Sequence, residues 1–215
     1  MSAPIPAQRE RTALCDLFEQ VGPDAPTLSG EWTTRDLAAH LIVRERRPDA
    51  AGGIVISALA GRTERVQAEV AERPWDELVK VVREGPPRWS PMRLEPADRA
   101  MNTIEFFVHH EDVRRAVDEW TARELDADTR NDLHRALKRF AKTLARGADV
   151  GVVLDATDAG GSTPIVARRA EPTGTIRGRI GEIVLYIYGR RAQAEVELDR
   201  DDDVRAALES APFGV

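Results

Sequence analysis

Three side chains that could do chemistry lie close together in residues 102–115, a stretch built around a short apolar run. Glu105 interrupts the apolar run 104–108, and His109 follows Glu105 by four residues. Four residues of an α-helix turn through about 400°, so these two side chains share one face, roughly one turn apart. Asp112 continues the same stripe. A carboxylate within an apolar run is costly unless a cation compensates it, so this stretch is the first candidate for a functional site.

Neutral imidazoles and carboxylates are ligands for zinc and other divalent metals. Glu105 and His109 would supply two ligands, and a histidine from a neighbouring helix would supply a third. His40 is the best candidate, because it lies between Leu37 and Leu41 on the inward side of its own predicted helix. Three protein ligands leave one position open, which is typical of a catalytic metal. Two alternatives stay open: His40 as a core histidine, and Glu105 with His109 as a buried structural pair.

The other reactive side chains have simpler interpretations. His110 is turned about 100° from His109, which directs it towards a neighbouring helix or solvent. Asp112 could orient His109 by accepting a hydrogen bond from its ring. Cys15 lies beside an apolar stripe with no evident base, which favours a buried, inert thiol. His134 falls near the start of a charged helix and is expected at the surface.

Composition restricts the class of protein. The 215 residues are 42% hydrophobic and 32% charged, as in ordinary globular proteins, and could form one large domain or two small ones. A net charge of −6 argues against a nucleic-acid-binding protein. No apolar run approaches the roughly 20 residues of a membrane helix, and no signal peptide is visible. The single cysteine excludes an internal disulfide. These features predict a soluble cytoplasmic protein whose oligomeric state is unknown.

Apolar spacing predicts mainly helices up to Gly147. A capping box, Thr33 with Asp36, marks the start of the helix that carries His40, and Pro48 marks its end. The segment 85–91, rich in proline, predicts a rigid connection that could cover a pocket. The other predicted helices cover residues 7–21, 50–72 (with a possible break at Gly61), 75–83, 97–119 and 126–144.

After Gly147 the pattern becomes mixed. We expect a hairpin turn at 158–162. Residues 179–187 suit a strand or a helix, and the flanking glycines favour a helix. The remaining predictions are strands at 150–155, 164–168 and 194–198, with a terminal helix at 201–208. The fold class is therefore α+β, with a helical domain over 1–147 and a small α/β domain over 148–215.

Two helical motifs resemble a known family. The pattern Trp32-Thr-x-x-Asp36-Leu37-x-x-His40-Leu41, followed by Glu105-x-x-x-His109-x-x-Asp112, is similar to the mycothiol-dependent maleylpyruvate isomerases. That family belongs to the DinB-like metal-binding proteins of actinobacteria and their relatives. The stretch 181–190 also resembles the small C-terminal α/β domain of the family. The resemblance covers most of the chain, and residues 45–95 match least.

The resemblance implies an up-down four-helix bundle that holds a divalent metal through His40, Glu105 and His109. Zinc is the first expectation, and nickel or iron would suit the same ligands. It also implies mycothiol or a similar low-molecular-weight thiol as cosubstrate, adding as a thiolate to an unsaturated or electrophilic small molecule. Arg190 matches a recurrent arginine of the family that could bind an anionic substrate. Arg44 and Arg65 are weaker candidates for that role. Each arginine could instead form a surface salt bridge.

This chain also departs from the well-known members of the family. It carries the charged segment 44–49 after the His40 helix, and His110 beside His109. These features resemble relatives whose substrates are not established. The resemblance therefore extends to the metal site and not to maleylpyruvate itself. Isomerase and thiol transferase are both open as activities. A non-catalytic metal- or ligand-binding protein of the same fold is the alternative.

Overall fold

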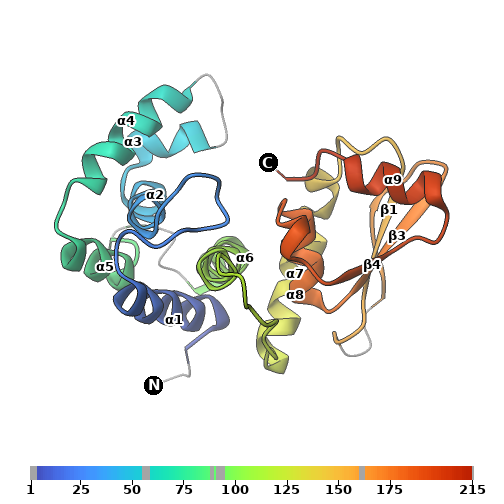
Figure 1. The fold of residues 1–215 in the computed structure, drawn as a ribbon, viewed down its shortest axis with the longest axis horizontal. Helices are drawn as coiled ribbons and strands as arrows, with labels where there is room; N and C mark the ends of the chain where they lie inside the picture. Colours follow the sequence, from blue (N-terminus) through green and yellow to red (C-terminus); the bar gives the residue numbers. More distant parts are fainter. Residues whose placement is uncertain (1–3, 55–58, 88–89, 91–94, 160–162, 215) are drawn as a thin grey trace. The chain divides into compact units, whose positions relative to one another are not determined.

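The computed structural model describes residues 4–54, 59–87, 90, 95–159 and 163–214 (Figure 1). It combines α-helices with a four-stranded sheet, so the predicted α+β class is confirmed. Contacts divide the chain into two compact units, Met1–Trp120 and Thr121–Val215. Within the described residues, no helix has the length and apolar character needed to cross a membrane.

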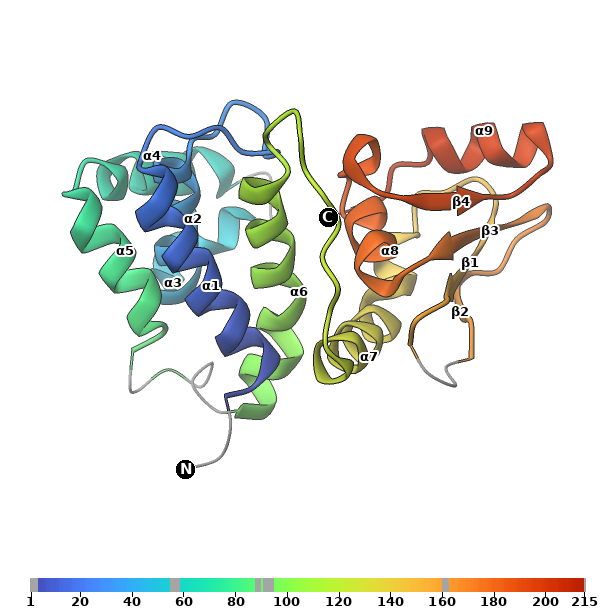
Figure 2. The same ribbon diagram turned by 60° about the horizontal axis from the view of Figure 1, so that its bottom comes forward.

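The first unit is built from helices packed side by side (Figure 2). Helix α1 packs against α5 and α6, and α2 packs against α4 and α5. The up-down bundle order stays a prediction. The helices are α1 (Pro6–Val21), α2 (Thr34–Arg46), α3 (Pro48–Ala51), α4 (Ala60–Ala71), α5 (Trp75–Glu84) and α6 (Glu95–Arg114), with a short 3-10 turn η1 (Gly52–Ile54).

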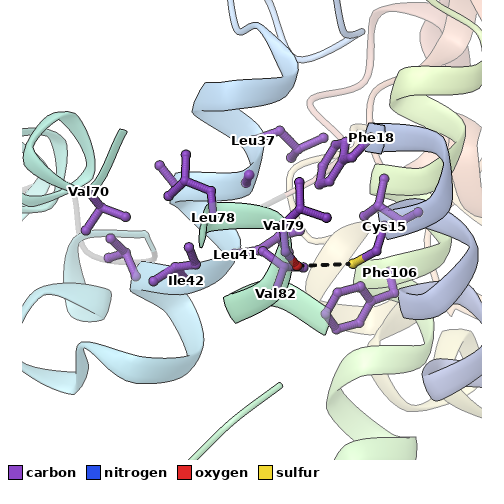
Figure 3. Packing of buried hydrophobic residues seen from close by; sticks show 14 of the residues in the cluster. Cys15, Phe18, Leu37, Leu41, Ile42, Val70, Leu78, Val79, Val82 and Phe106 are labelled. Atoms are coloured by element: carbon purple, nitrogen blue, oxygen red, sulfur yellow. Dashed lines mark hydrogen bonds between the residues drawn. The ribbon is translucent and has the colours of Figure 1, made fainter. Parts of the chain in front are cut away.

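An apolar core joins these helices. Phe18 of α1, Leu41 of α2 and Phe106 of α6 are completely buried and meet side chains of α5 (Figure 3). Cys15 belongs to this core, where its thiol contacts the Val79 carbonyl at 3.9 Å. Burial raises the pKa of the Cys15 thiol to about 12. The core therefore holds Cys15 as an inert, protonated side chain, as expected.

Local chemistry explains where α2 begins. Asp36 accepts a hydrogen bond from the Thr33 amide at 2.9 Å, and the Thr33 side chain accepts one from the Asp36 amide, which completes the predicted capping box. The predicted helix over residues 50–72 is instead divided between α3, η1 and α4, and residues 55–58 lie outside the described part.

Helix α6 is shorter than its apolar pattern suggests, since it ends at Arg114 and not near residue 119. Beyond that end, Val117 is 55% exposed, so no packing partner favours a further turn. The Arg115 side chain pairs with Glu111 at 2.6 Å and lies over the ring of Trp120 at 4.4 Å. Through Arg115, Trp120 is held near the end of α6.

The second unit contains a sheet of order β2-β1-β3-β4, in which only β1 and β3 are parallel among the described pairings. Alternate residues Val152, Leu154 and Ile176 are buried, so one face of the sheet carries the core. The elements are β1 (Gly151–Ala156), β2 (Ile165–Arg168), β3 (Thr173–Gly178), β4 (Val196–Leu198), α7 (Ala127–Leu144), α8 (Ile180–Ile187) and α9 (Asp202–Ser210).

Strand β3 was not predicted from the sequence, because the two glycines of this strand weaken its pattern. Gly174 is needed there, since a Cβ atom at this position would lie 2.6 Å from the Val204 side chain of α9. The helix favoured for residues 179–187 is present as α8, and the Asp158 carboxylate accepts the Ile180 amide at 2.7 Å. The predicted turn at 158–162 and the predicted connection at 85–91 both lie partly outside the described residues.

Helix α7 lies in the second unit, so the boundary predicted near residue 147 differs from the division by contacts. Its stripe of Leu133, Leu137 and Leu144 is buried, and α7 packs against β2 and α8. A stripe of leucines shows that a face is buried but not which element buries it. The change of pattern near residue 147 marks where helix gives way to strand.

Candidate metal centre

Helices α2 and α6 bring the three predicted metal ligands together. His40 comes from α2, and Glu105 and His109 come from successive turns of α6. One possible ligand atom from each residue lies within 4.8 Å of the other two. The Glu105 Oε1 atom is 3.4 Å from His40 Nε2 and 3.3 Å from His109 Nε2. Among the described residues, no other group of three or more histidines, cysteines and acids converges in this way.

This arrangement fits a divalent ion. In a tetrahedral zinc site with bonds of about 2.0–2.2 Å, neighbouring ligand atoms lie roughly 3.4 Å apart. Both imidazole-to-carboxylate distances agree with that separation. Two imidazoles and one carboxylate are also a donor set that zinc, nickel and iron accept. Such a set would leave a further coordination position for an exchangeable ligand.

Asp112 fixes the orientation of the His109 ring. Its Oδ2 atom lies 2.9 Å from His109 Nδ1, so a proton on Nδ1 would leave Nε2 to face Glu105. The Asp112 side chain is completely buried, and the Ser29 hydroxyl donates to the same Oδ2 atom at 2.9 Å. The Leu28 amide donates to the Asp112 carbonyl at 3.0 Å. The loop between α1 and α2 is therefore tied to α6 beside the site.

The same loop places an aromatic ring on the site. The centroid of the Trp32 ring lies 5.1 Å from that of His40, and the His40 ring lies 5.3 Å from that of His109. The Thr27 hydroxyl donates to the Trp32 carbonyl at 2.8 Å, which holds the end of the loop. His40 and His109 are only 7% and 8% exposed, so the imidazoles are largely shielded from water.

Arg44 contacts the Glu105 carboxylate. From the sequence, Arg44 was a candidate only for substrate binding. Arg44 Nε lies 3.1 Å from Glu105 Oε1, and Arg44 Nη1 donates to Asn102 Oδ1 at 2.6 Å. The spacing that brings these groups together is visible in the sequence, because Arg44 follows His40 by four residues and Asn102 precedes Glu105 by three. Arg44 also offers a structural alternative, since its charge compensates the Glu105 carboxylate without a metal.

The site shifts the pKa values of its groups in different directions. Burial lowers the pKa of His40. Burial opposes ionisation of Glu105, but Arg44, His109 and His40 together hold its pKa well below the ordinary value. Burial also disfavours the charged form of His109, but hydrogen bonds to Asp112 and Glu105 raise its pKa to about 9. A divalent ion binding near neutral pH would therefore displace a proton from His109.

The remaining candidates are not members of the convergent group of three residues. His110 is buried, and its Nδ1 atom lies 2.8 Å from Glu10 Oε2 on α1. Arg65 is exposed on α4 and donates to the Gly61 carbonyl at 3.1 Å. Arg190 belongs to the second unit, where its guanidinium donates to the Tyr188 carbonyl at 2.6 Å. Its role in substrate binding stays a prediction.

Comparisons with known proteins show similarity in fold. No protein-family model matches the sequence, and no curated protein matches it either. Two solved structures are similar over 90% of both chains, and both are of the mycothiol-dependent maleylpyruvate isomerase. A point mutant of that enzyme gives a TM-score of 0.53 at 17% identity. The other structure gives a TM-score of 0.48 at 16% identity. At this level of identity, the similarity shows that the fold is shared.

Proposed function

We propose that this chain binds a divalent metal ion, zinc by first expectation, through His40, Glu105 and His109. The observation that carries the proposal is the convergence of three ligand atoms within 4.8 Å. The fold shared with the mycothiol-dependent maleylpyruvate isomerase supports this proposal, and the similarity covers 90% of both chains. The same similarity favours an up-down order for the helices of the first unit.

We further propose that the protein is an enzyme that uses mycothiol or a similar low-molecular-weight thiol. A bound divalent ion would supply the positive charge that keeps a thiol deprotonated near neutral pH. Asp112 would hold His109 with its proton on Nδ1, and both imidazoles are largely shielded from water. The thiolate sulfur would form a bond to an unsaturated carbon as a π bond of the substrate breaks, and its later elimination would restore the double bond in an isomerase. In a thiol transferase, the sulfur would displace a leaving group from an electrophilic carbon and stay in the product. Arg190 is the candidate that binds an anionic substrate. Isomerase and thiol transferase activities are both consistent with this chemistry.

A non-catalytic metal-binding protein is the second candidate function. The low exposure of His40 and His109 favours it, because a structural metal site is closed to substrates. The side chain of Glu105 is 22% exposed, compared with 9% for His40 and 11% for His109, so Glu105 gives the greatest access among the three candidate ligands. The two functions therefore differ in whether a thiol reaches the ion past Glu105.

Metal analysis of the purified, untagged protein tests the first proposal. We expect one ion per chain in the parent protein and its loss in His40→Ala. His110→Gln is the matched control, because His110 is the neighbour of a candidate ligand but faces Glu10 of α1 instead of the site. The control should retain the ion. No ion in any variant, with circular dichroism showing folded protein, would leave the Arg44–Glu105 ion pair as the explanation of the buried carboxylate.

Thiol binding separates the enzyme from the non-catalytic protein. Cobalt replaces zinc in such sites and reports a sulfur ligand by a new absorption band. We expect that band when mycothiol is added to the cobalt-loaded protein, and its absence in His40→Ala. A cobalt spectrum that does not change at saturating thiol would contradict the thiol-dependent enzyme and leave the metal-binding proposal in place.

A further inference from the structure

Arg44 places a permanent positive charge on the carboxylate of the candidate metal centre. Its Nε atom is 3.1 Å from Glu105 Oε1, the same oxygen that faces His40 Nε2 and His109 Nε2. Asn102, which is completely buried, accepts from Arg44 Nη1 at 2.6 Å and holds the guanidinium from a second side. Arginine stays protonated at any pH the protein tolerates, so this charge does not titrate away.

A guanidinium in this position acts on a divalent ion and on an anionic ligand in opposite directions. The ion and the guanidinium are both attracted to Glu105 Oε1 and repel each other. A divalent ion with the Glu105 carboxylate and two neutral imidazoles carries a net charge of +1, which the Asp112 carboxylate beside His109 lowers to 0 and Arg44 raises again to +1. The side chain of Arg44 is only 14% exposed, so water screens this charge incompletely.

We propose that Arg44 determines which ligands the centre accepts: it weakens binding of the metal ion and strengthens binding of an anion at the exchangeable position. The inference rests on the proposed function, because it requires an ion at His40, Glu105 and His109. It deepens that proposal by naming the class of exchangeable ligand. Anions such as thiolates and carboxylates are favoured over neutral ligands such as amines or alcohols.

Substitutions that remove the charge test this inference. Arg44→Gln and Arg44→Met both delete the guanidinium, and Arg44→Lys keeps a positive charge. Zinc affinity is measured by competition with a chromophoric chelator, and thiocyanate affinity is measured from the visible spectrum of the cobalt-loaded protein. We expect each neutral variant to bind zinc about tenfold more tightly and thiocyanate about tenfold more weakly, which is about one logarithmic unit in each direction. Arg44→Lys should stay near the parent protein in both.

The opposite signs distinguish an electrostatic role from a structural one. If Arg44 only held Glu105 in place, its removal would weaken zinc and thiocyanate binding together. That result, or unchanged affinities for both ligands, would overturn the inference. Two neutral variants are used so that the result does not depend on one of them folding, which circular dichroism checks.

Arg46→Gln is the matched control for net charge. Arg46 lies on the same helix but donates to the Gly85 carbonyl at 2.8 Å and pairs with Glu84 at 3.2 Å. Its removal should leave both affinities unchanged. A parent protein that binds no zinc refutes the proposed function. A parent protein that binds zinc, with no effect of the Arg44 substitutions, refutes only the role of Arg44.

Discussion

Two buried polar clusters of the first unit share helix α6 but differ in how their groups are paired. His109 and His110 are adjacent in the sequence, and each belongs to a different cluster. The metal cluster consists of His40, Arg44, Glu105 and His109, and the ion-pair cluster consists of Glu10, Arg11, Glu45 and His110.

In the ion-pair cluster, each carboxylate has its own nitrogen partner. Arg11 donates two hydrogen bonds to Glu45, at 2.5 and 2.8 Å, and a third to the Val82 carbonyl at 2.9 Å. His110 contacts Glu10 at 2.8 Å. In the metal cluster, three nitrogen-bearing side chains meet at the single Oε1 atom of Glu105, at 3.1–3.4 Å. A separate partner compensates the charge of each buried carboxylate, whereas convergence on one atom creates a place where an ion can bind.

The largest effect on folding is expected in the ion-pair cluster. Arg11→Met removes the partner of Glu45, whose side chain is only 3% exposed, and leaves a buried carboxylate uncompensated. We expect a loss of about 3–5 kcal/mol in the free energy of unfolding. The metal content should not change, because Arg11 contacts none of the three candidate ligands in the bonds described. Urea denaturation and metal analysis of the same preparation check both expectations.

The double variant Arg11→Met/Glu45→Met provides the control. It replaces both charges by apolar side chains of similar length and should recover most of the lost stability. A double variant as unstable as Arg11→Met would show that the ion pair is not the origin of the effect. Loss of metal in either variant would contradict the separation of the two clusters.

The metal cluster is expected to make the stability of the metal-free protein depend on pH. The pKa of His109 is raised from 6.5 to about 9 in the folded protein. A raised pKa stabilises the fold fully below pH 6.5, and this contribution is lost as the pH rises through about 9. The difference corresponds to about 3 kcal/mol of unfolding free energy. Denaturant unfolding in the presence of a chelator, from neutral to alkaline pH, measures the loss.

His109→Gln should remove this alkaline loss. The double variant Arg11→Met/Glu45→Met should retain it, because the ion-pair cluster does not supply the raised pKa. If the free energy of unfolding of the metal-free parent protein stayed constant from neutral pH through pH 9, this result would contradict the ion pairs assigned to His109.

The change Asp112→Asn is expected to weaken metal binding, although less than His40→Ala does. The variant removes the negative charge that orients His109 and raises the basicity of its ring. We expect the zinc affinity to fall about 10- to 100-fold. The comparison is made above the pKa of about 9 of His109, so that a change in proton competition does not mask the effect. An affinity equal to that of the parent protein would show that packing alone orients the ring.

The sequence was sufficient to predict the groups that depend on a single helix. The spacing of Glu105 and His109, the capping box of Thr33, and the turn of His110 away from His109 all follow from helical geometry. Pairing His40 with α6 rested on its inward position on its own helix and on the family resemblance, because Glu105 lies 65 residues further along the chain.

Apart from the convergence of His40 with Glu105, the contacts between elements named here were not predicted. The bond between Ser29 and Asp112 spans 83 residues, and nothing in the local pattern marks Ser29. The pairing of Arg44 with Glu105 is also long-range, although both residues lie on the faces that the spacing identifies. Strand β3 was missed for a local reason, its glycines, and the grouping of α7 with the sheet depends on tertiary packing that an amphipathic pattern does not specify.

The smallest of the expected effects tests how far the support of the metal cluster extends. Ser29→Ala removes the hydroxyl that donates to Asp112 at 2.9 Å and leaves Asp112 with its bond to His109. A hydrogen bond to a charged group contributes about 1.5–3 kcal/mol, but only the part that changes the orientation of His109 reaches the metal. We therefore expect zinc affinity to fall by less than the change in Asp112→Asn, about threefold to tenfold. Combining the two substitutions should add nothing to Asp112→Asn, since Ser29 acts through Asp112. An additive effect in the double variant, measured by the same chelator competition, would show that Ser29 supports the site by another route.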